Sequence, residues 1–239
     1  MLKKNERIDD LECRGYRIIQ DPDGYCFTSD SVLLANIAKA GRKDRVADLC
    51  TGSGVIALLV AAKYRPAEVV GVELQARLAD MAERSVALNG AESVVKIVNA
   101  PVQGITKVIG SGFDVVTVNP PYGEKTENEN PDEKEICKNE YMLTLEEVIA
   151  ESAALLRYGG AFYMIHKTRR MADAVFYMRK YSIEPKKIYF VYPKKSKDSD
   201  TFIVEGKRGG KAGLTVPSPL IVYDDEGNYT PEVRSLYNK

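Results

Sequence analysis

Short apolar runs alternate with helix-forming stretches between residues 46 and 165. Five strands are predicted, at residues 46–50, 69–73, 94–98, 113–119 and 161–165. The helices between them are predicted at residues 55–63, 75–89 and 145–156, and Gly159 and Gly160 are expected to close the last one. Parallel neighbours in a sheet need crossover connections, so the alternation indicates a Rossmann-like, doubly wound α/β fold with helices on both faces.

The chain after residue 165 predicts an antiparallel addition to this sheet. A helix at 170–181 is followed by strands at 187–192 and 201–205, and the polar connection 193–200 between them is short enough for a hairpin. The expected sheet is therefore mostly parallel and seven-stranded, with an antiparallel edge hairpin. We divide the chain into an N-terminal segment (1–45), a central domain (46–210) and a C-terminal extension on the surface (211–239), which together form a single compact domain. Residues 123–138 are expected to form a polar, acidic loop.

Composition argues against several classes of protein. The 239 residues are 44% hydrophobic and 28% charged, which is ordinary for a soluble globular protein. The charged N-terminus is not followed by an apolar signal segment, and no apolar run approaches the roughly 18 residues that span a membrane. Four scattered cysteines and a single histidine, His166, predict no metal site and free thiols. We expect a cytoplasmic protein without membrane contact, as a monomer or weak dimer.

A glycine-containing loop, residues 48–54, lies at the first predicted strand-to-helix junction. Glycines let a backbone approach a ligand closely, and ligands of open α/β sheets bind at the carboxyl ends of the strands. Ala57 replaces the third glycine of the dinucleotide fingerprint, which disfavours a pyrophosphate ligand. Glu73 follows the loop at about the spacing of a carboxylate that holds ribose hydroxyls, and Asp48 suits a ligand ammonium or an ordered water. The alternatives are a loop-capping Asp48 and a merely exposed Glu73.

The motif Asn119-Pro120-Pro121-Tyr122 directly follows the predicted strand at 113–119. Successive prolines fix the backbone, so that the side-chain amide and a main-chain carbonyl point outward together. Two such acceptors would bind the hydrogens of an amine conjugated to a ring and direct its lone pair to a methyl donor. Tyr122 could stack on a planar acceptor. The alternative is a proline-stiffened turn.

Basic residues gather in one part of a chain whose net charge is zero. Thirteen lysines and arginines, against five acidic residues, lie between residues 167 and 211. Such a cluster would neutralise phosphates of a nucleic acid, or would form an ordinary solvated surface. The candidates for contact with RNA are Lys167, Arg169, Arg170, Lys194, Lys195 and Lys197.

Together these motifs resemble those of class I S-adenosylmethionine-dependent N-methyltransferases, over roughly residues 45–165. The upstream segment 16–35 is similar to the opening of the bacterial adenine-N6 methyltransferases that modify valine tRNA. The resemblance implies the class I methyltransferase fold and S-adenosyl-L-methionine as cofactor. It also implies that the loop and Asp48 line the methionine part of the cofactor, Glu73 holds its ribose, and Thr28 and Asp30 cover it. Thr28 to Asp30 also read as an ordinary helix N-cap.

The resemblance assigns two groups of site residues. The catalytic group is Asn119, Pro120, Pro121 and Tyr122. The cofactor group is Thr28, Asp30, Asp48, Cys50, Thr51, Gly52, Gly54, Glu73, Leu74, Asn99, Ala100 and Asn119. Relatives commonly carry an acidic residue where this chain has Asn99, so Asn99 or the backbone at Ala100 is expected to hold the cofactor adenine.

The predicted reaction is methyl transfer to an exocyclic amine, with N6 of adenine in tRNA as the first choice of acceptor. Methylation of a protein glutamine or of an rRNA base is an alternative within the same class. A different class of function is that of a non-catalytic RNA-binding protein that keeps this fold.

Overall fold

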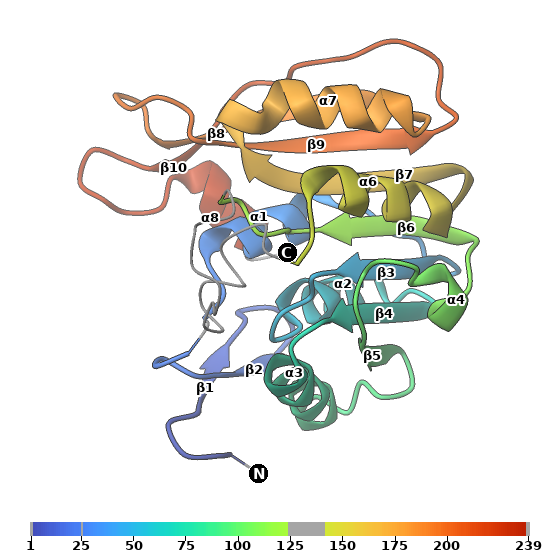
Figure 1. Cartoon of the computed structure of the whole chain (residues 1–239). Helices are drawn as coiled ribbons and strands as arrows, with labels where there is room; N and C mark the ends of the chain where they lie inside the picture. The colour runs from blue at the N-terminus through green and yellow to red at the C-terminus, as the bar shows by residue number, and fades with distance from the viewer. Residues whose placement is uncertain (1, 25, 124–141, 238–239) are drawn as a thin grey trace.

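The computed structural model describes residues 2–24, 26–123 and 142–237, so nearly all of the predicted acidic loop at 123–138 lies outside the described residues. Eight strands of the described chain form one sheet in the order β10-β8-β9-β7-β6-β3-β4-β5 (Figure 1). Their bounds are β3 Arg45–Leu49, β4 Glu68–Glu73, β5 Val95–Asn99, β6 Phe113–Val118, β7 Leu156–Lys167, β8 Ile183–Lys194, β9 Thr201–Arg208 and β10 Leu220–Tyr223. The predicted doubly wound α/β fold is confirmed.

The order of the strands places a topological switch point between β3 and β6. The chain runs outward from β3 to β4 and β5, and then returns to β6 on the other side of β3. Strands β3 and β6 are parallel, with Asp48 opposite Thr117 and Leu49 opposite Val118. Crossover connections leave in opposite directions from such a point, which opens a crevice at the carboxyl ends of the two strands.

Helices cover both faces of the sheet (Figure 1). On one face lie α1 (Ser29–Ile37), α2 (Val55–Tyr64) and the C-terminal α8 (Pro231–Tyr237), and on the other α6 (Leu145–Leu155) and α7 (Met171–Lys180). Two hydrophobic clusters fill the space between the layers. Eight of the ten residues of α2 are buried, because this helix is packed between the sheet and α1. No helix in the part of the chain that the structure describes is long and apolar enough to span a membrane.

An N-terminal hairpin that the sequence did not predict packs beside α3 (Ala76–Leu88). Its strands β1 (Arg7–Asp10) and β2 (Arg17–Gln20) are antiparallel. The backbone N–H of Ile19 donates to Ser85 Oγ at 3.0 Å, and Arg84 of α3 pairs with Glu6 at 2.7 Å. Because these partners lie more than sixty residues apart in the chain, no local pattern indicates the pairing.

The predicted count of seven strands is wrong, because residues 220–223 add an eighth. Strand β10 pairs in parallel with β8 and forms the sheet edge. Leu220 and Val222 are 6% and 5% exposed, and Val233 of α8 is fully buried, so these residues do not form the expected surface tail. The predicted antiparallel hairpin β8–β9 is confirmed, but β9 lies inside the sheet between β7 and β8. A strand of four residues carries too little periodicity to be predicted alone.

The expected closure of α6 by Gly159 and Gly160 is also wrong. Helix α6 ends at Leu155, and β7 begins at once with Leu156, so that both glycines lie within the strand. A Cβ atom on Gly160 would lie 3.0 Å from the carbonyl oxygen of Arg157 and 3.1 Å from that of Asp114. Gly160 is therefore needed for the close approach of β7 to β6, and its role is one of packing.

Candidate active site

Asp48 supports the glycine loop from beneath. Its carboxylate is fully buried at the end of β3 and accepts hydrogen bonds from Thr117 Oγ1 at 2.7 Å and Thr51 Oγ1 at 2.5 Å. Loss of hydration in this position raises the pKa of Asp48 to about 7, although the two threonine hydroxyls oppose the shift. With both oxygens engaged, Asp48 holds the loop in place, which favours the loop-capping interpretation of the sequence.

Asp48→Asn is expected to change the pH dependence of stability. Because the pKa of Asp48 rises from 3.8 to about 7 on folding, the native protein loses stability as pH rises from about 4 to about 7. The near-isosteric amide has no charge to bury, so the free energy of unfolding of the variant, relative to wild type, should improve by roughly 4 kcal/mol over that range. Urea unfolding at a series of pH values measures the difference.

Two other groups serve as checks on this prediction. Burial lowers the pKa of His166 to about 4, which adds stability above about pH 6.5 that is lost as pH falls, but equally in both proteins. Burial acts to raise the pKa of Asp114, but hydrogen bonds from the Arg45 backbone and Arg157 outweigh it and the pKa is lowered. The free energy of unfolding of Asp114→Asn, relative to wild type, should therefore fall as pH rises. If the free energy of unfolding of Asp48→Asn differed from that of wild type by the same amount at every pH, Asp48 would carry no buried charge.

Glu73 joins the glycine loop to the next helix. Its Oε2 accepts from the backbone N–H of Gly52 at 2.9 Å, and its Oε1 accepts from that of Gln75 at 2.8 Å. Each carboxylate oxygen has a second lone pair that can accept another hydrogen bond. Glu73 is 6% exposed and lines a cavity, and a carboxylate in this position suits the two hydroxyls of a ribose.

The backbone of the loop is left-handed at three residues, two of which are glycines. The φ angles of Cys50, Gly52 and Gly54 are 57°, 58° and 90°. A Cβ atom on Gly54 would also lie 3.2 Å from Cβ of Ala82 in α3. Gly54 thus meets two requirements, a left-handed backbone and close helix packing.

A small cavity of about 70 Å³ opens between the glycine loop and Glu73. It is lined by Cys50, Gly52, Val72, Glu73, Leu74, Gln75, Val102, Gln103, Asn119, Pro121, Met142 and Leu143. The carboxylate on one side and the apolar side chains on the other fit a nucleoside, whose ribose is polar and whose base is flat. The side chains of Leu74 and Met142 are the exposed apolar members of this lining.

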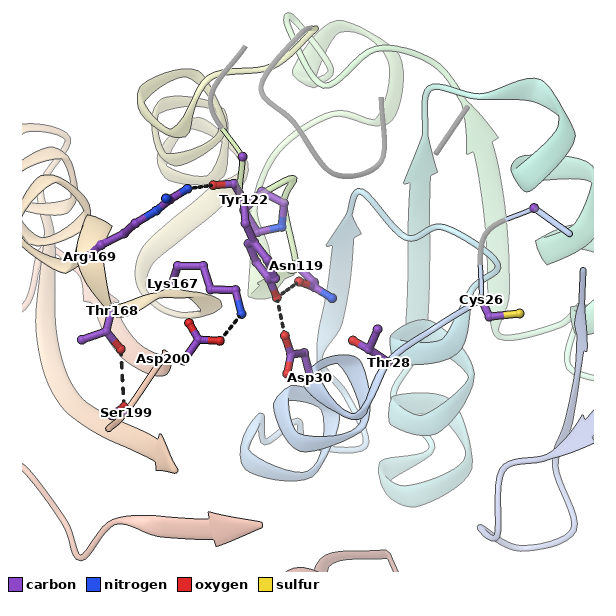
Figure 2. A pocket seen from close by; sticks show the side chains of 13 residues that line it. Cys26, Thr28, Asp30, Asn119, Tyr122, Lys167, Thr168, Arg169, Ser199 and Asp200 are labelled. Carbon is purple, nitrogen blue, oxygen red and sulfur yellow. Dashed lines mark hydrogen bonds and ion pairs between the residues drawn. The ribbon is translucent and has the colours of Figure 1, made fainter. Parts of the chain in front are cut away.

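Asn119 also lines a second and larger cavity of about 880 Å³ (Figure 2). Its lining residues are Gly24, Cys26, Thr28, Asp30, Asn119, Pro120, Tyr122, Gly123, Lys167, Thr168, Arg169, Ser199 and Asp200. Asn119 Nδ2 donates to Ser31 Oγ at 2.8 Å, which fixes the orientation of the amide. Because Asn119 lines both cavities, its side chain stands where the contents of one would meet those of the other.

Tyr122 is held on several sides within the larger cavity. Its hydroxyl lies 2.5 Å from Asn119 Oδ1 and 3.1 Å from Asp30 Oδ2, and Lys167 Nζ is 5.3 Å from its ring centroid (Figure 2). The His166 ring meets Tyr122 edge-on, with centroids 5.2 Å apart. His166 Nδ1 accepts from the Lys167 backbone at 2.8 Å, and its buried Nε2 has no hydrogen-bond partner among the described residues. The neutral imidazole therefore acts as packing for Tyr122.

The predicted cofactor residues occupy four positions in the structure. Cys50, Gly52, Glu73 and Leu74 line the small cavity, Thr28 and Asp30 line the large one, and Asn119 lines both. Asp48, Thr51 and Gly54 form the base of the loop. Asn99 Nδ2 donates to the carbonyls of Glu73 and Leu74 at 2.8 and 2.9 Å, and Ala100 N donates to the Glu73 carbonyl. Thr28 is the N-cap of α1 by position but makes no side-chain capping bond.

Several residues of the site carry no signal in the sequence. Val102, Gln103 and Leu143 line the small cavity from segments that show no motif. Gln20 is fully buried, donates to Ser53 Oγ at 2.7 Å and accepts from the Phe27 backbone at 2.9 Å. It thereby ties the glycine loop to the segment that carries Thr28 and Asp30. Only the tertiary structure brings these groups together.

Two of the six predicted RNA contacts line the large cavity. Lys167 and Arg169 line it, and Lys195 and Lys197 are exposed on the turn that leads to Ser199 and Asp200 in its wall. Lys167 pairs with Asp200 at 2.7 Å, Arg170 with Asp173 at 2.8 Å, and Lys194 donates to the carbonyl of Asp225. The contact with RNA itself stays a prediction.

Comparison with known proteins identifies the family. Residues 27–182 match the model of the methyltransferase small domain, so the chain belongs to that family. A tRNA1(Val) (adenine(37)-N6)-methyltransferase of Porphyromonas gingivalis is 25% identical over 190 residues, which cover 77% of this chain and 74% of the relative. A predicted O-methyltransferase from Agrobacterium tumefaciens has a similar structure, with a TM-score of 0.71, 26% identity, and coverage of 87% of this chain and 95% of that one.

A more distant structure has the same fold. Geranyl diphosphate C-methyltransferase from Streptomyces coelicolor, solved with S-adenosyl-L-homocysteine, has a TM-score of 0.55 at 13% identity, over 75% of this chain and 76% of that one. The chain thus belongs to a family of methyltransferases. The donor set of the small cavity agrees, because it offers a carboxylate for a ribose and an apolar wall for a base.

Proposed function

We propose that the protein transfers a methyl group from S-adenosyl-L-methionine to N6 of an adenine in tRNA. The observation that carries this proposal is the position of Asn119 between the two cavities. A side-chain amide at that junction can accept a hydrogen bond from an exocyclic amine on one side while a methyl donor lies on the other. The similarity to tRNA1(Val) adenine-N6 methyltransferases supports tRNA as the acceptor.

The roles of the residues follow from what each side chain can do. The bound cofactor supplies an electrophilic methyl group on a sulfonium, so the protein needs to align the acceptor. Asn119 Oδ1 and the Pro120 carbonyl would accept the two amine hydrogens, which turns the nitrogen lone pair toward the methyl group. The Tyr122 ring would stack on the base, and the large cavity has room for a nucleotide taken out of its stack.

Incubation of the purified protein with methyl-labelled cofactor and unmodified total tRNA tests the proposal. Nucleoside analysis should show label in N6-methyladenosine. Label in a different nucleoside would mean that the acceptor atom is not N6 of adenine. If tRNA takes up no label but rRNA or a release-factor glutamine does, tRNA is the wrong acceptor, and RNA affinity without any methyl transfer would indicate a non-catalytic RNA binder.

Lys195→Ala/Lys197→Ala is expected to weaken tRNA binding in a salt-dependent way. Each lysine that neutralises a phosphate adds roughly 0.7 to 0.9 to the slope of log affinity against log salt, so losing both should reduce the slope by at most about 2. Fluorescence anisotropy with labelled tRNA at several salt concentrations measures it. Lys96→Ala on β5, at the far edge of the sheet, is the matched control. An unchanged slope in the double variant would place the RNA elsewhere.

A further inference from the structure

A chain of hydrogen-bonding side chains runs along the wall of the large cavity from Asn119 to Asp30. The Tyr122 hydroxyl stands between Asn119 Oδ1, at 2.5 Å, and Asp30 Oδ2, at 3.1 Å (Figure 2). Ser31 holds the Asn119 amide by accepting from its Nδ2, so that the acceptor atom Oδ1 faces Tyr122. Asp30 and Ser31 both come from the first turn of α1, whereas Tyr122 follows β6.

The hydrogen bonds among Asn119, Tyr122 and Asp30 depend on how many protons these side chains carry. A phenol has one proton, and an ionised Asp30 and the amide oxygen of Asn119 are both acceptors only. Tyr122 can then donate to just one of its two neighbours. Both contacts are hydrogen bonds at the same time only when Asp30 carries a proton, donates it to the Tyr122 oxygen, and Tyr122 donates to Asn119. The geometry therefore provides a place for one extra proton on Asp30.

The surroundings of Asp30 favour uptake of that proton. Burial raises the pKa of Asp30 above its usual range, and this effect outweighs the lowering by the Lys167 charge and by the Tyr122 hydroxyl. Asp200, on the turn before β9, raises it further and is itself paired with Lys167 of β7 at 2.7 Å. His166 beside Tyr122 is neutral near pH 7, because burial lowers its pKa to about 4.

We propose that Asp30 is the proton acceptor of the methyl-transfer step and that the Tyr122 hydroxyl relays the proton to it. The inference rests on the proposed function, in which the acceptor is an amine bound at Asn119. Such an amine becomes cationic when it is methylated and must release a proton. The amine replaces the Tyr122 hydroxyl as the donor to Asn119 Oδ1, which frees Tyr122 to donate to Asp30.

The step balances in atoms and charge. The nitrogen lone pair forms the N–C bond, and the electron pair of the broken S–C bond stays on sulfur. The N–H bond then breaks, and its electron pair returns to nitrogen. The proton held at Asn119 Oδ1 passes to the Tyr122 oxygen, which lies 2.5 Å from Oδ1, while the proton of Tyr122 passes to the Asp30 carboxylate. One sulfonium charge and one carboxylate charge disappear together, and Asp30 later gives its proton to water in the cavity.

Single-turnover methyl transfer to tRNA, measured from about pH 5 to about pH 8, tests the relay. The wild-type rate should fall as pH falls and Asp30 becomes protonated. Asp30→Asn should be slower at pH 8 by about 10²–10⁴-fold and should lose this fall in rate at low pH, whereas Asp30→Glu should keep it. Asp48 titrates near pH 7 in all three proteins, so only the comparison among them isolates Asp30. A uniformly slower Asp30→Asn with the wild-type profile would overturn the proposal.

A second measurement uses the full-length protein without RNA or cofactor. Carboxyl ¹³C NMR, with Asp30→Asn to assign the resonance, should give a pKa of Asp30 above the ordinary value. Tyr122→Phe should raise it further, because the ionised carboxylate loses a donor. An Asp30 pKa that Tyr122→Phe leaves unchanged would overturn the relay even if tRNA is methylated. If tRNA is not methylated but Tyr122→Phe raises the pKa of Asp30, tRNA is the wrong acceptor. The hydrogen bond between Asp30 and Tyr122 would still be supported.

Discussion

Asn119→Ala is expected to lower the single-turnover rate of methyl transfer by about 10²–10³-fold, the usual cost of removing one preorganised polar group that acts in the transition state. Asn119 Oδ1 is the acceptor that would orient the amine, and the amide is held in place by Ser31 at 2.8 Å. The affinity for tRNA should change little, because alanine removes no positive charge. Rapid-quench transfer assays and anisotropy binding assays on the same preparation separate the two effects.

Two further variants define the role of the amide. Ser31→Ala leaves Oδ1 present but removes the partner that fixes it, so a rate between wild type and Asn119→Ala is expected. Asn36→Ala, on the same helix as Ser31 but outside both cavities, serves as the control for effects on α1. Survival of wild-type turnover in Asn119→Ala would show that the acceptor amine binds elsewhere.

Glu73→Ala is expected to weaken the binding of S-adenosyl-L-methionine by about 10²–10⁴-fold, as the loss of two hydrogen bonds to a charged group at about 1.5–3 kcal/mol each would produce. The carboxylate also holds the backbone N–H groups of Gly52 and Gln75. Isothermal titration calorimetry measures the affinity, and thermal unfolding without cofactor measures the structural part of the effect.

Glu68→Ala is the matched control for Glu73, because both residues lie on β4 but at opposite ends. Glu68 pairs with Arg45 at 2.9 Å and Lys96 at 3.1 Å, far from the crevice. The control should lose a little stability and keep its cofactor affinity. Equal loss of affinity in both variants would mean that Glu73 acts only through the stability of the strand.

Residues that are neighbours in the sequence determined the central fold and the two loops of the site, the glycine loop after β3 and the proline-containing turn after β6. Apolar runs ending in a glycine loop or in a proline pair mark strands β3 and β6 with their turns, because turn geometry depends on residues that are neighbours in the chain. Parallel strands place their carboxyl ends at one edge, so Glu73 and Asn119 were expected near the loop without knowledge of any contact. Their presence at the small cavity agrees with that expectation.

The tertiary structure alone decided which of these residues face a ligand. Asp48 and Glu73 lie at the carboxyl ends of neighbouring strands, yet burial beside Thr51 and Thr117 makes Asp48 a support for the loop, while Glu73 lines a cavity. The partners of Asp30, Gln20 and β10 lie far away in the sequence. Such pairings depend on long-range packing and on the loss of water around each group, and neither property can be read from neighbouring residues.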